Sequence, residues 1–294
     1  MTRKISLLLA IIMAFCSCIA LSSCGGDPAS ENGEGVELYV FDYHISDDGS
    51  YYIVTGYGVT TDMVSTIPEE YEGKPIKEIQ SGAFYNDPIG KTIEEMTLAA
   101  NIEVIGSSAF YECVTLHTIN FKSGLKTIGH GAFAKCSSLT KAALPEGLLY
   151  IDDFAFRECV KLESVTLPST LTHLGANVFA GTKYLNEKAP VHNGNITHCP
   201  DTAFKTWVIN AQFDIVDANL PDNTVGIASD AFAYCDKLTT LELPKDVKYI
   251  SKDAFIGCTA LTTVNYGGSA EDFAKIVIES GNEALSSATI NFAG

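Results

Sequence analysis

The chain has 294 residues, of which 46% are hydrophobic and 19% charged, and its formal net charge is −17. The apolar content excludes a disordered chain, and the length allows one or two folded domains. The excess of acidic residues repels phosphate backbones, so the composition excludes nucleic acid as a partner.

Residues 1–23 have the pattern of a secretory signal. Arg3 and Lys4 precede an apolar run, residues 5–21, and small residues then lead to Cys24. A run of this length is short for a membrane span, which is the alternative interpretation. The ending Leu-Ser-Ser-Cys resembles the lipobox of bacterial lipoproteins. This resemblance implies cleavage before Cys24, acylation of its thiol, and an exported protein anchored to the membrane by lipid.

The next two segments lead into the folded region. Residues 24–35 are a predicted flexible tether, because they carry no aliphatic or aromatic side chain larger than alanine. Residues 36–66 are predicted to form an N-terminal cap of strands. Within them Asp48-Gly49 is the expected turn of a β-hairpin.

Residues 67–266 repeat a pattern of about 23 residues. One column of the repeat is phenylalanine, with Ile or Leu usually five residues before it and, in five copies, Cys three residues after it. The column consists of Phe84, Phe110, Phe133, Phe156, Phe179, Phe204, Phe232 and Phe255. A unit of this size buries its apolar face only against its neighbours, so the repeats predict a solenoid.

Each unit contains short elements. The alternation in Leu162–Leu167 is typical of a half-buried strand, which Pro168 ends. The Ala-Phe-x-x-Cys segment is expected to form one turn of α- or 3₁₀-helix. The sequence therefore predicts about eight coils of short parallel strands joined by short helical or 3₁₀ turns, with a cap at each end.

The pattern Leu-x-x-Ile-x-Leu-Pro-x-x-Leu-x-x-Ile-Gly-x-x-Ala-Phe-x-x-Cys resembles the BspA-like, or Treponema-type, leucine-rich repeat of bacterial surface proteins. Its clearest copies are Leu116–Cys136, Leu139–Cys159 and Leu238–Cys258. The resemblance implies a leucine-rich repeat solenoid at the cell surface that adheres to host matrix or to other cells.

Residues 267–294 are expected to form the C-terminal cap. Ser269 and Asp272 resemble the two ends of a capping box, with Asp in place of Glu. Phe273, Ile276 and Val277 then have the spacing of one apolar helical face. Residues 289–292 read as a last short strand.

Six cysteines remain beyond the signal and the lipidated residue. They are Cys113, Cys136, Cys159, Cys199, Cys235 and Cys258. Five occupy the cysteine column, and Cys199 occupies the Ile column, so all six stand where packing needs a small apolar group. Buried, reduced thiols are the expectation, and disulfides or a metal cluster are the alternatives.

The repeat is irregular over residues 182–226. Trp207 stands in a cysteine column and Asn210 in a leucine column. Repeat arrays often carry functional loops where the repeat is interrupted. The alternative is neutral sequence drift of one coil. Trp207 is either an enlarged core residue or a ligand contact. The candidate ligand-binding residues are His192, Asn193, Asn195, His198 and Trp207. The spacing of His192, His198, Cys199 and Asp201 matches no metal-ligand pattern, so no metal site is predicted.

The sequence contains no catalytic motif, so no enzyme activity and no cofactor are predicted. The expected function is that of a membrane-anchored recognition scaffold for adhesion, with an extracellular protein or glycan as its ligand. A glycan-binding or nutrient-capture lipoprotein is the alternative. The predicted solvent face of the strands is small and polar, with Thr118, Ser164 and Thr166 among its residues, and does not favour stacking on sugars.

Overall fold

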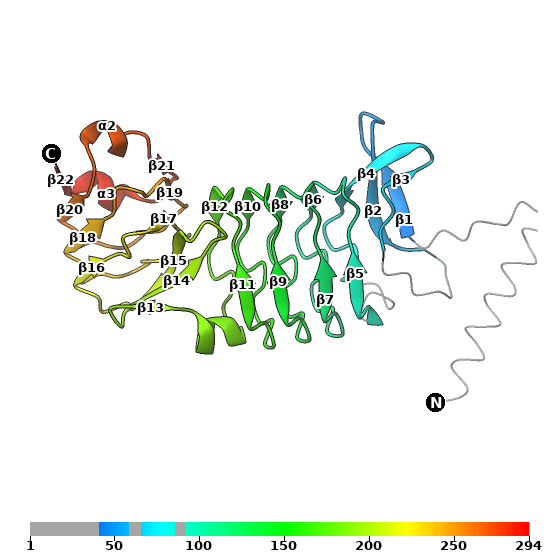
Figure 1. Cartoon of the computed structure of the whole chain (residues 1–294), viewed down its shortest axis with the longest axis horizontal. Coiled ribbons are helices and arrows are strands. Elements are labelled where there is room, and N and C mark those ends of the chain that lie inside the picture. The colour runs from blue at the N-terminus through cyan, green and yellow to red at the C-terminus, as the bar shows by residue number, and fades with distance from the viewer. Residues whose placement is uncertain (1–40, 59–65, 86–91, 294) are drawn as a thin grey trace, which may run out of the picture. The chain divides into compact units, whose positions relative to one another are not determined.

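The computed structural model describes residues 41–58, 66–85 and 92–293 (Figure 1). Residues Leu38–Gly294 form one compact unit. The predicted signal, the tether and Cys24 lie outside the described residues. Short strands and turns dominate the described residues, and the longest helical segments have five residues.

The N-terminal cap is a β-hairpin that starts the stack. β1 (Phe41–Ile45) and β2 (Tyr52–Tyr57) are antiparallel and flank the turn at Gly49, whose φ is +71°. β2 then pairs in parallel with β4 (Lys74–Ile79), against which β3 (Glu70–Tyr71) folds back. The hairpin predicted at Asp48-Gly49 is confirmed, and it covers the first edge of the parallel sheet.

Regular coils contribute two short strands that run parallel to those of the neighbouring coil, in ladders that are interrupted between β7 and β9 and at the irregular segment (Figure 1). We call them the main strand and the second strand. The main strands are β5 (Glu95–Thr97), β7 (Thr118–Asn120), β9 (Lys141–Ala143), β11 (Ser164–Thr166), β16 (Asp217–Asn219), β18 (Thr240–Leu243), β20 (Thr263–Tyr266) and β22 (Thr289–Phe292). The second strands after β4 are β6 (Val104–Ile105), β8 (Thr127–Ile128), β10 (Tyr150–Ile151), β12 (His173–Leu174), β17 (Thr224–Ile227), β19 (Tyr249–Ile250) and β21 (Val277–Ile278). The predicted solenoid of short parallel strands is confirmed.

The third side of each coil, where the sequence predicts one turn of α- or 3₁₀-helix, is a pair of tight turns with bonds between residues three apart. In the coil of Phe133, Gly131 and Lys135 have φ of +57° and +62°. The N–H of Ala134 bonds the carbonyl of Gly131, and the N–H of Cys136 bonds that of Phe133. A left-handed residue on each side of the phenylalanine ends any helix, although the spacing of buried residues is the same as in a helical turn.

The phenylalanine column forms two ring stacks in the core, one before and one after the irregular segment. Phe110, Phe133 and Phe156 are fully buried, with ring centroids 5.0 and 5.2 Å apart and ring planes within 7° of parallel. Phe232 and Phe255 repeat this arrangement near the C-terminus, at 4.9 Å. The apolar columns of the sequence are therefore layers of a packed interior on each side of the irregular segment, and within each stack one ring supports the next.

The irregular segment contains an antiparallel insert. It comprises a π-helical turn η2 (Tyr184–Lys188) and the strands β13 (Val191–His192), β14 (Ile196–Pro200) and β15 (Thr206–Ala211). β14 pairs antiparallel with both neighbours, whereas β15 returns to the parallel direction beside β17. Trp207 packs in the N-terminal hydrophobic core and Val208 in the C-terminal one. β15 therefore separates two cores.

Two predicted column positions in this segment are wrong. Val208, and not Cys199, aligns with Ile227 in the Ile column. Phe204 lies in the turn between β14 and β15 and is 88% exposed. In that turn the carboxylate of Asp201 accepts the N–H groups of Ala203 and Lys205, which favours the turn over a regular coil.

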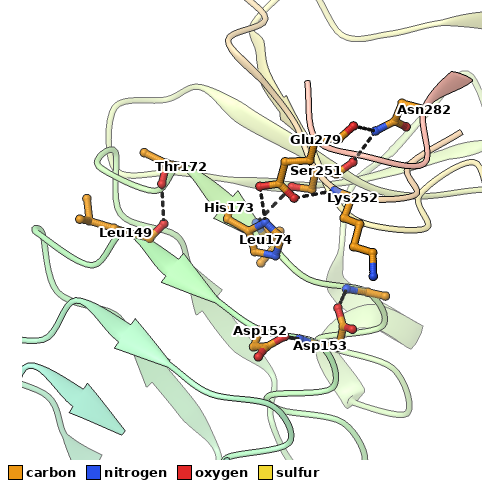
Figure 2. Close-up of polar contacts among 11 residues, drawn as sticks. Leu149, Asp152, Asp153, Thr172, His173, Leu174, Ser251, Lys252, Glu279 and Asn282 are labelled. Atoms are coloured by element: carbon orange, nitrogen blue, oxygen red, sulfur yellow. Dashed lines mark hydrogen bonds and ion pairs between the residues drawn. The ribbon is translucent and has the colours of Figure 1, made fainter. Parts of the chain in front are cut away.

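We call the coils before the irregular segment the N-terminal array and those after it the C-terminal array. The two arrays meet at β12 (Figure 2). The backbone of Leu174 accepts a bond from Ser229 N–H and donates one to the Ser251 hydroxyl. The buried His173 ring lies 2.8 Å from a carboxylate oxygen of Glu279 and stacks on Tyr150, with ring centroids 4.0 Å apart. The partners on the C-terminal side follow β17, β19 and β21, so β12 contacts three successive coils. The arrays are joined by this contact and by the insert, and not by a continuous ladder.

The C-terminal cap begins with a short helix, as predicted. Ser269 caps α2 (Ala270–Phe273) by accepting the N–H of Asp272. The helix ends too early for one apolar face, because Val277 lies in β21 and is exposed. A second helix, α3 (Glu283–Ser287), leads into β22, where the last strand was expected.

Asn282 completes the hydrogen bonding of the last coil (Figure 2). In inner coils the phenylalanine N–H bonds a carbonyl of the next coil, as Phe232 does to Ala254. Phe255 has no such coil ahead, and the side-chain oxygen of Asn282 accepts its N–H at 3.0 Å. The amide nitrogen of Asn282 donates to the carbonyls of Ser251 and Glu279. The side chain thus replaces backbone that the array lacks.

We expect Asn282→Ala to lower the free energy of unfolding by about 1–3 kcal/mol, because it leaves the buried N–H of Phe255 unpaired and removes the bonds that the amide donates to Ser251 and Glu279. Urea denaturation followed by circular dichroism measures the change. Asn291→Ala is the matched control, since that amide is exposed and bonds Asn265 on the surface, and it should cost less than about 0.5 kcal/mol. Equal losses for the two variants would contradict the capping role.

The six cysteines are free and buried, as predicted. Thiols in the column donate to the phenylalanine carbonyl of the preceding coil, as Cys136 does to Phe110 and Cys159 to Phe133, both at 3.1 Å. Burial raises the pKa of Cys199 and Cys258 to about 12. The native state therefore holds these thiols in the protonated, unreactive form.

We expect alkylation of the six thiols by iodoacetamide at pH 8 to be slow in the native protein and complete in urea, as read by peptide mass spectrometry. Fast native labelling would contradict burial.

The raised pKa values of the thiols also predict that the protein is less stable at alkaline pH. The unfolded thiols lose protons from about pH 9, while the folded thiols keep theirs to about pH 12. Stability is therefore complete below pH 9 and falls as the pH rises across this window.

Candidate functional site

The solvent face of the main strands is small and polar, as the sequence predicted. Along the stack, polar side chains bond one another. The amide of Asn120 donates to the Thr97 hydroxyl at 3.0 Å, and that of Asn291 donates to Asn265 at 2.8 Å. These ladders satisfy the side chains within the fold. The face is therefore explained by strand pairing and solubility without a ligand.

The insert β13–β14–β15 holds the predicted site residues. His192 ends β13, and the exposed Asn193 has a left-handed φ of 51° in the turn to β14. Asn195 follows in that turn, and its side-chain oxygen is buried without a hydrogen-bond partner. Gln212, after β15, bonds the carbonyls of Gly194 and Asn195, which fixes the turn against the start of the next coil.

His198 lies in the middle of β14 and is half-buried. Its Nδ1 is 2.8 Å from the hydroxyl of Thr206 on β15. Burial, followed by the nearby His192, lowers the pKa of His198. The two histidines are thus brought near one another, and His198 is held in its neutral form by its surroundings.

Trp207 is a core residue, and its candidacy as a ligand contact is wrong. The side chain is 1% exposed. Its indole ring lies over Gly226, where a Cβ atom would come within 2.5 Å of Cε3. It is parallel to the ring of Tyr249 in the following strand, with centroids 6.0 Å apart. The absence of a side chain at Gly226 makes room for this packing.

Sequence reasoning missed two exposed aromatic residues beside the insert. Phe213 and Tyr234 are 73% and 70% exposed. They lie on adjacent turns, because the thiol of Cys235 donates to the carbonyl of Gln212. We call these two side chains the Phe213 patch. It defines the candidate binding surface, and the turn of Asn193 adjoins it through the bonds of Gln212.

The spacing around Phe213 contained a misleading signal. Phe213 follows Val208 by five residues, as Phe232 follows Ile227, which predicts a buried ring. The coil from Val208 to Ile227 is four residues shorter than a regular one. Ala211 takes the buried position and bonds the next coil, which leaves Phe213 in solvent.

One group in the described part of the chain has metal-ligand spacing. His130, Asp152 and Asp153 place ligand atoms within 4.8 Å of one another. His130 is exposed, and both carboxylates already accept backbone N–H groups, from Asp153 itself and from Ala176. The predicted loop residues His192, His198, Cys199 and Asp201 do not form such a group.

Stacked parallel strands, a leucine-rich repeat and a buried ring column define a leucine-rich repeat solenoid. Such solenoids are typically non-catalytic scaffolds that bind through extended surfaces. The chain belongs to the family described as BspA type leucine rich repeat region, whose model matches residues 77–209 and 209–291 in six copies. The family resemblance seen in the sequence is confirmed.

Solved structures show the same kind of repeat. The chain is 26% identical to a leucine rich repeat protein of T. pallidum, with 76% of this chain and 88% of that chain covered and a TM-score of 0.49. A leucine rich cell surface protein of Faecalibacterium prausnitzii is 18% identical over 88% of this chain and 100% of that chain, with a TM-score of 0.41. A leucine-rich repeat protein of Bacteroides ovatus is 20% identical over 87% and 76%, with a TM-score of 0.42. The family assignment rests on the repeats and not on these scores.

No curated protein matches the sequence. Among the helices of the described residues, none has the length and apolarity of a membrane span.

Proposed function

We propose that the protein is a lipid-anchored recognition scaffold on the bacterial cell surface, and that it binds an extracellular protein in adhesion. The family supports a binding scaffold, and the Leu-Ser-Ser-Cys sequence supports anchoring through Cys24. The observation that carries the proposal is the Phe213 patch. Large exposed aromatic side chains are the residues that most often dominate protein interfaces.

The proposed contact comprises the Phe213 patch together with His192, Asn193 and Asn195 of the adjoining turn. This contact has an aromatic centre and polar amides around it, which is the composition of a small interface core with a polar rim. The strand face, by contrast, offers Thr, Ser, Asn, Lys and Glu side chains and no aromatic platform. The alternative of glycan capture is therefore not supported on that face.

The test is binding of the detergent-solubilised full chain to a panel of immobilised extracellular-matrix proteins. The double variant Phe213→Ser, Tyr234→Ser should weaken binding at least ten-fold, which is about 1.4 kcal/mol, because it removes two rings that the complex would bury. Val114→Ser is the matched control, since Val114 is exposed in the coil of Phe110, several coils before the insert. Binding to no member of the panel, or equal binding by both variants, would overturn the proposal.

Anchoring has a separate test. Cys24→Ser should release the protein from the membrane fraction or leave it as an unprocessed precursor, because the acylated thiol is lost. Fractionation and acylation like those of the wild type would contradict the lipobox interpretation.

A further inference from the structure

A hollow of about 400 Å³ lies on the turn side of three successive coils in the N-terminal array. Its floor is made by the small residues Gly131 and Ala134 of the middle coil. Tyr111 from the preceding coil and Phe154 from the following coil flank this floor. A coil with small turn residues between two coils with aromatic ones thus creates the depression, which we call the Phe154 hollow.

Phe154 is an unusual residue for its position. It has φ of 59°, in the left-handed region that bulky side chains rarely adopt. The same column in other coils holds Gly82, Ser108, Gly131, Asn177, Asp230 and Asp253. The ring gains little from the core, because it remains half-exposed. Such a residue is typical of a functional constraint.

The walls of the hollow are held in place by their neighbours. The edge of His130 meets the ring of Phe154 at 5.3 Å, and the guanidinium of Arg157 lies 5.4 Å from the same ring. Opposite them, the Lys135 ammonium lies 5.1 Å from the ring of Tyr111. A cation of the lining therefore lies over each of the two aromatic rings.

The charges of the hollow balance. Lys135 pairs with Glu112 at 3.1 Å, and Arg157 pairs with Glu158 at 3.2 Å. No excess of positive charge remains to attract an anion, and the chain as a whole carries −17. The site instead offers aromatic surface, N–H donors and carboxylate acceptors side by side. This combination suits a neutral ligand with an apolar face and many hydroxyl groups.

The geometry points to a binding site for a neutral glycan in the Phe154 hollow, in which sugar rings stack on Tyr111 and Phe154 in place of the two cations, and their hydroxyls bond Lys135, Arg157 and Glu158. The C–H face of a pyranose meets an aromatic face, and its hydroxyls need both donors and acceptors. The volume lies within the range of small-molecule sites and accommodates a short oligosaccharide. This site is separate from the Phe213 patch and does not depend on the proposed protein contact.

An array of neutral, sialylated and sulfated oligosaccharides, probed with the solubilised full chain, tests the assignment. The wild type should retain neutral glycans, and Phe154→Gly and Tyr111→Ala should each weaken that binding at least ten-fold. Glycine suits the left-handed backbone at position 154, so the melting temperature of Phe154→Gly should not fall. The variant therefore separates loss of binding from loss of folding.

Phe213→Ser with Tyr234→Ser is the matched control and should bind the glycan as the wild type does. This control also separates the glycan site from the proposed protein contact. No retention of any glycan, unchanged binding by Phe154→Gly, or a preference for the sialylated or sulfated members would each overturn the assignment.

Discussion

Replacing Phe133 by alanine is expected to lower the free energy of unfolding by about 3–5 kcal/mol. Phe133 is fully buried, and its ring lies between those of Phe110 and Phe156. Its loss opens a cavity inside a column whose layers support one another, and the coil backbones cannot close it while their ladders persist. Urea denaturation followed by circular dichroism measures the loss.

Val160→Ala is a suitable control for this substitution, because Val160 is an exposed apolar residue in the next coil. It should change stability by less than about 0.5 kcal/mol. A loss below 1 kcal/mol for Phe133→Ala would show that the ring column is not the structural core.

Replacing Trp207 by alanine is expected to cost a similar amount, about 3–5 kcal/mol. The indole fills the N-terminal core at the strand that separates the two arrays, and it occupies the space above Gly226. Gly226→Ala alone should also destabilise the protein, because its Cβ would overlap the indole. In the double variant the new methyl group enters the space that Trp207 vacates, so the two losses should not add.

A double-mutant cycle measures this coupling. We expect the loss in the double variant to be at least 1 kcal/mol smaller than the sum of the two single losses. Strict additivity would contradict direct packing of Trp207 on Gly226. Wild-type stability of Trp207→Ala would restore the ring as a candidate surface contact.

The regular coils could be predicted from the sequence because their columns are exact. Val165 lies beside Ala142, and Ile151 beside Ile128, each one repeat apart. The type of turn could not be predicted from the sequence, because a helical turn and two tight turns bury the same positions. The left-handed residues decide between them. Lys135 and Glu158 at such positions give no sequence signal, because neither residue is typical of that conformation.

The irregular segment misled the column analysis for a physical reason. In the antiparallel insert, residues that would form the turns of a regular coil form strands instead, and the following coil is shorter. The number of residues between equivalent positions therefore changes. Counting in steps of the repeat from Phe179 therefore assigns Phe204 to the phenylalanine column, where Ala211 lies, and Cys199 to the Ile column, where Val208 lies. Cys199 is buried as expected, but it lies beside Trp207 in the antiparallel pair of β14 and β15 and not in the Ile column.

The candidate surfaces were only partly visible in the sequence. The irregularity drew attention to His192 and Asn193, which lie at the end of β13 and in the turn that follows it, and their role in binding stays a prediction. Phe213 could not be identified, because its spacing from Val208 is that of a core residue. Phe154 had an available signal, since other coils place Gly, Asn, Asp or Ser in its column.

Hydrogen–deuterium exchange of the full chain, alone and with the matrix protein that it retains from the panel, tests whether the Phe213 patch binds that protein. We expect slower exchange on binding in peptides that cover residues 190–216 and 230–236. We expect no change in β5, β7, β9 and β11. Protection confined to these main strands would contradict the account and would assign binding to the polar strand face.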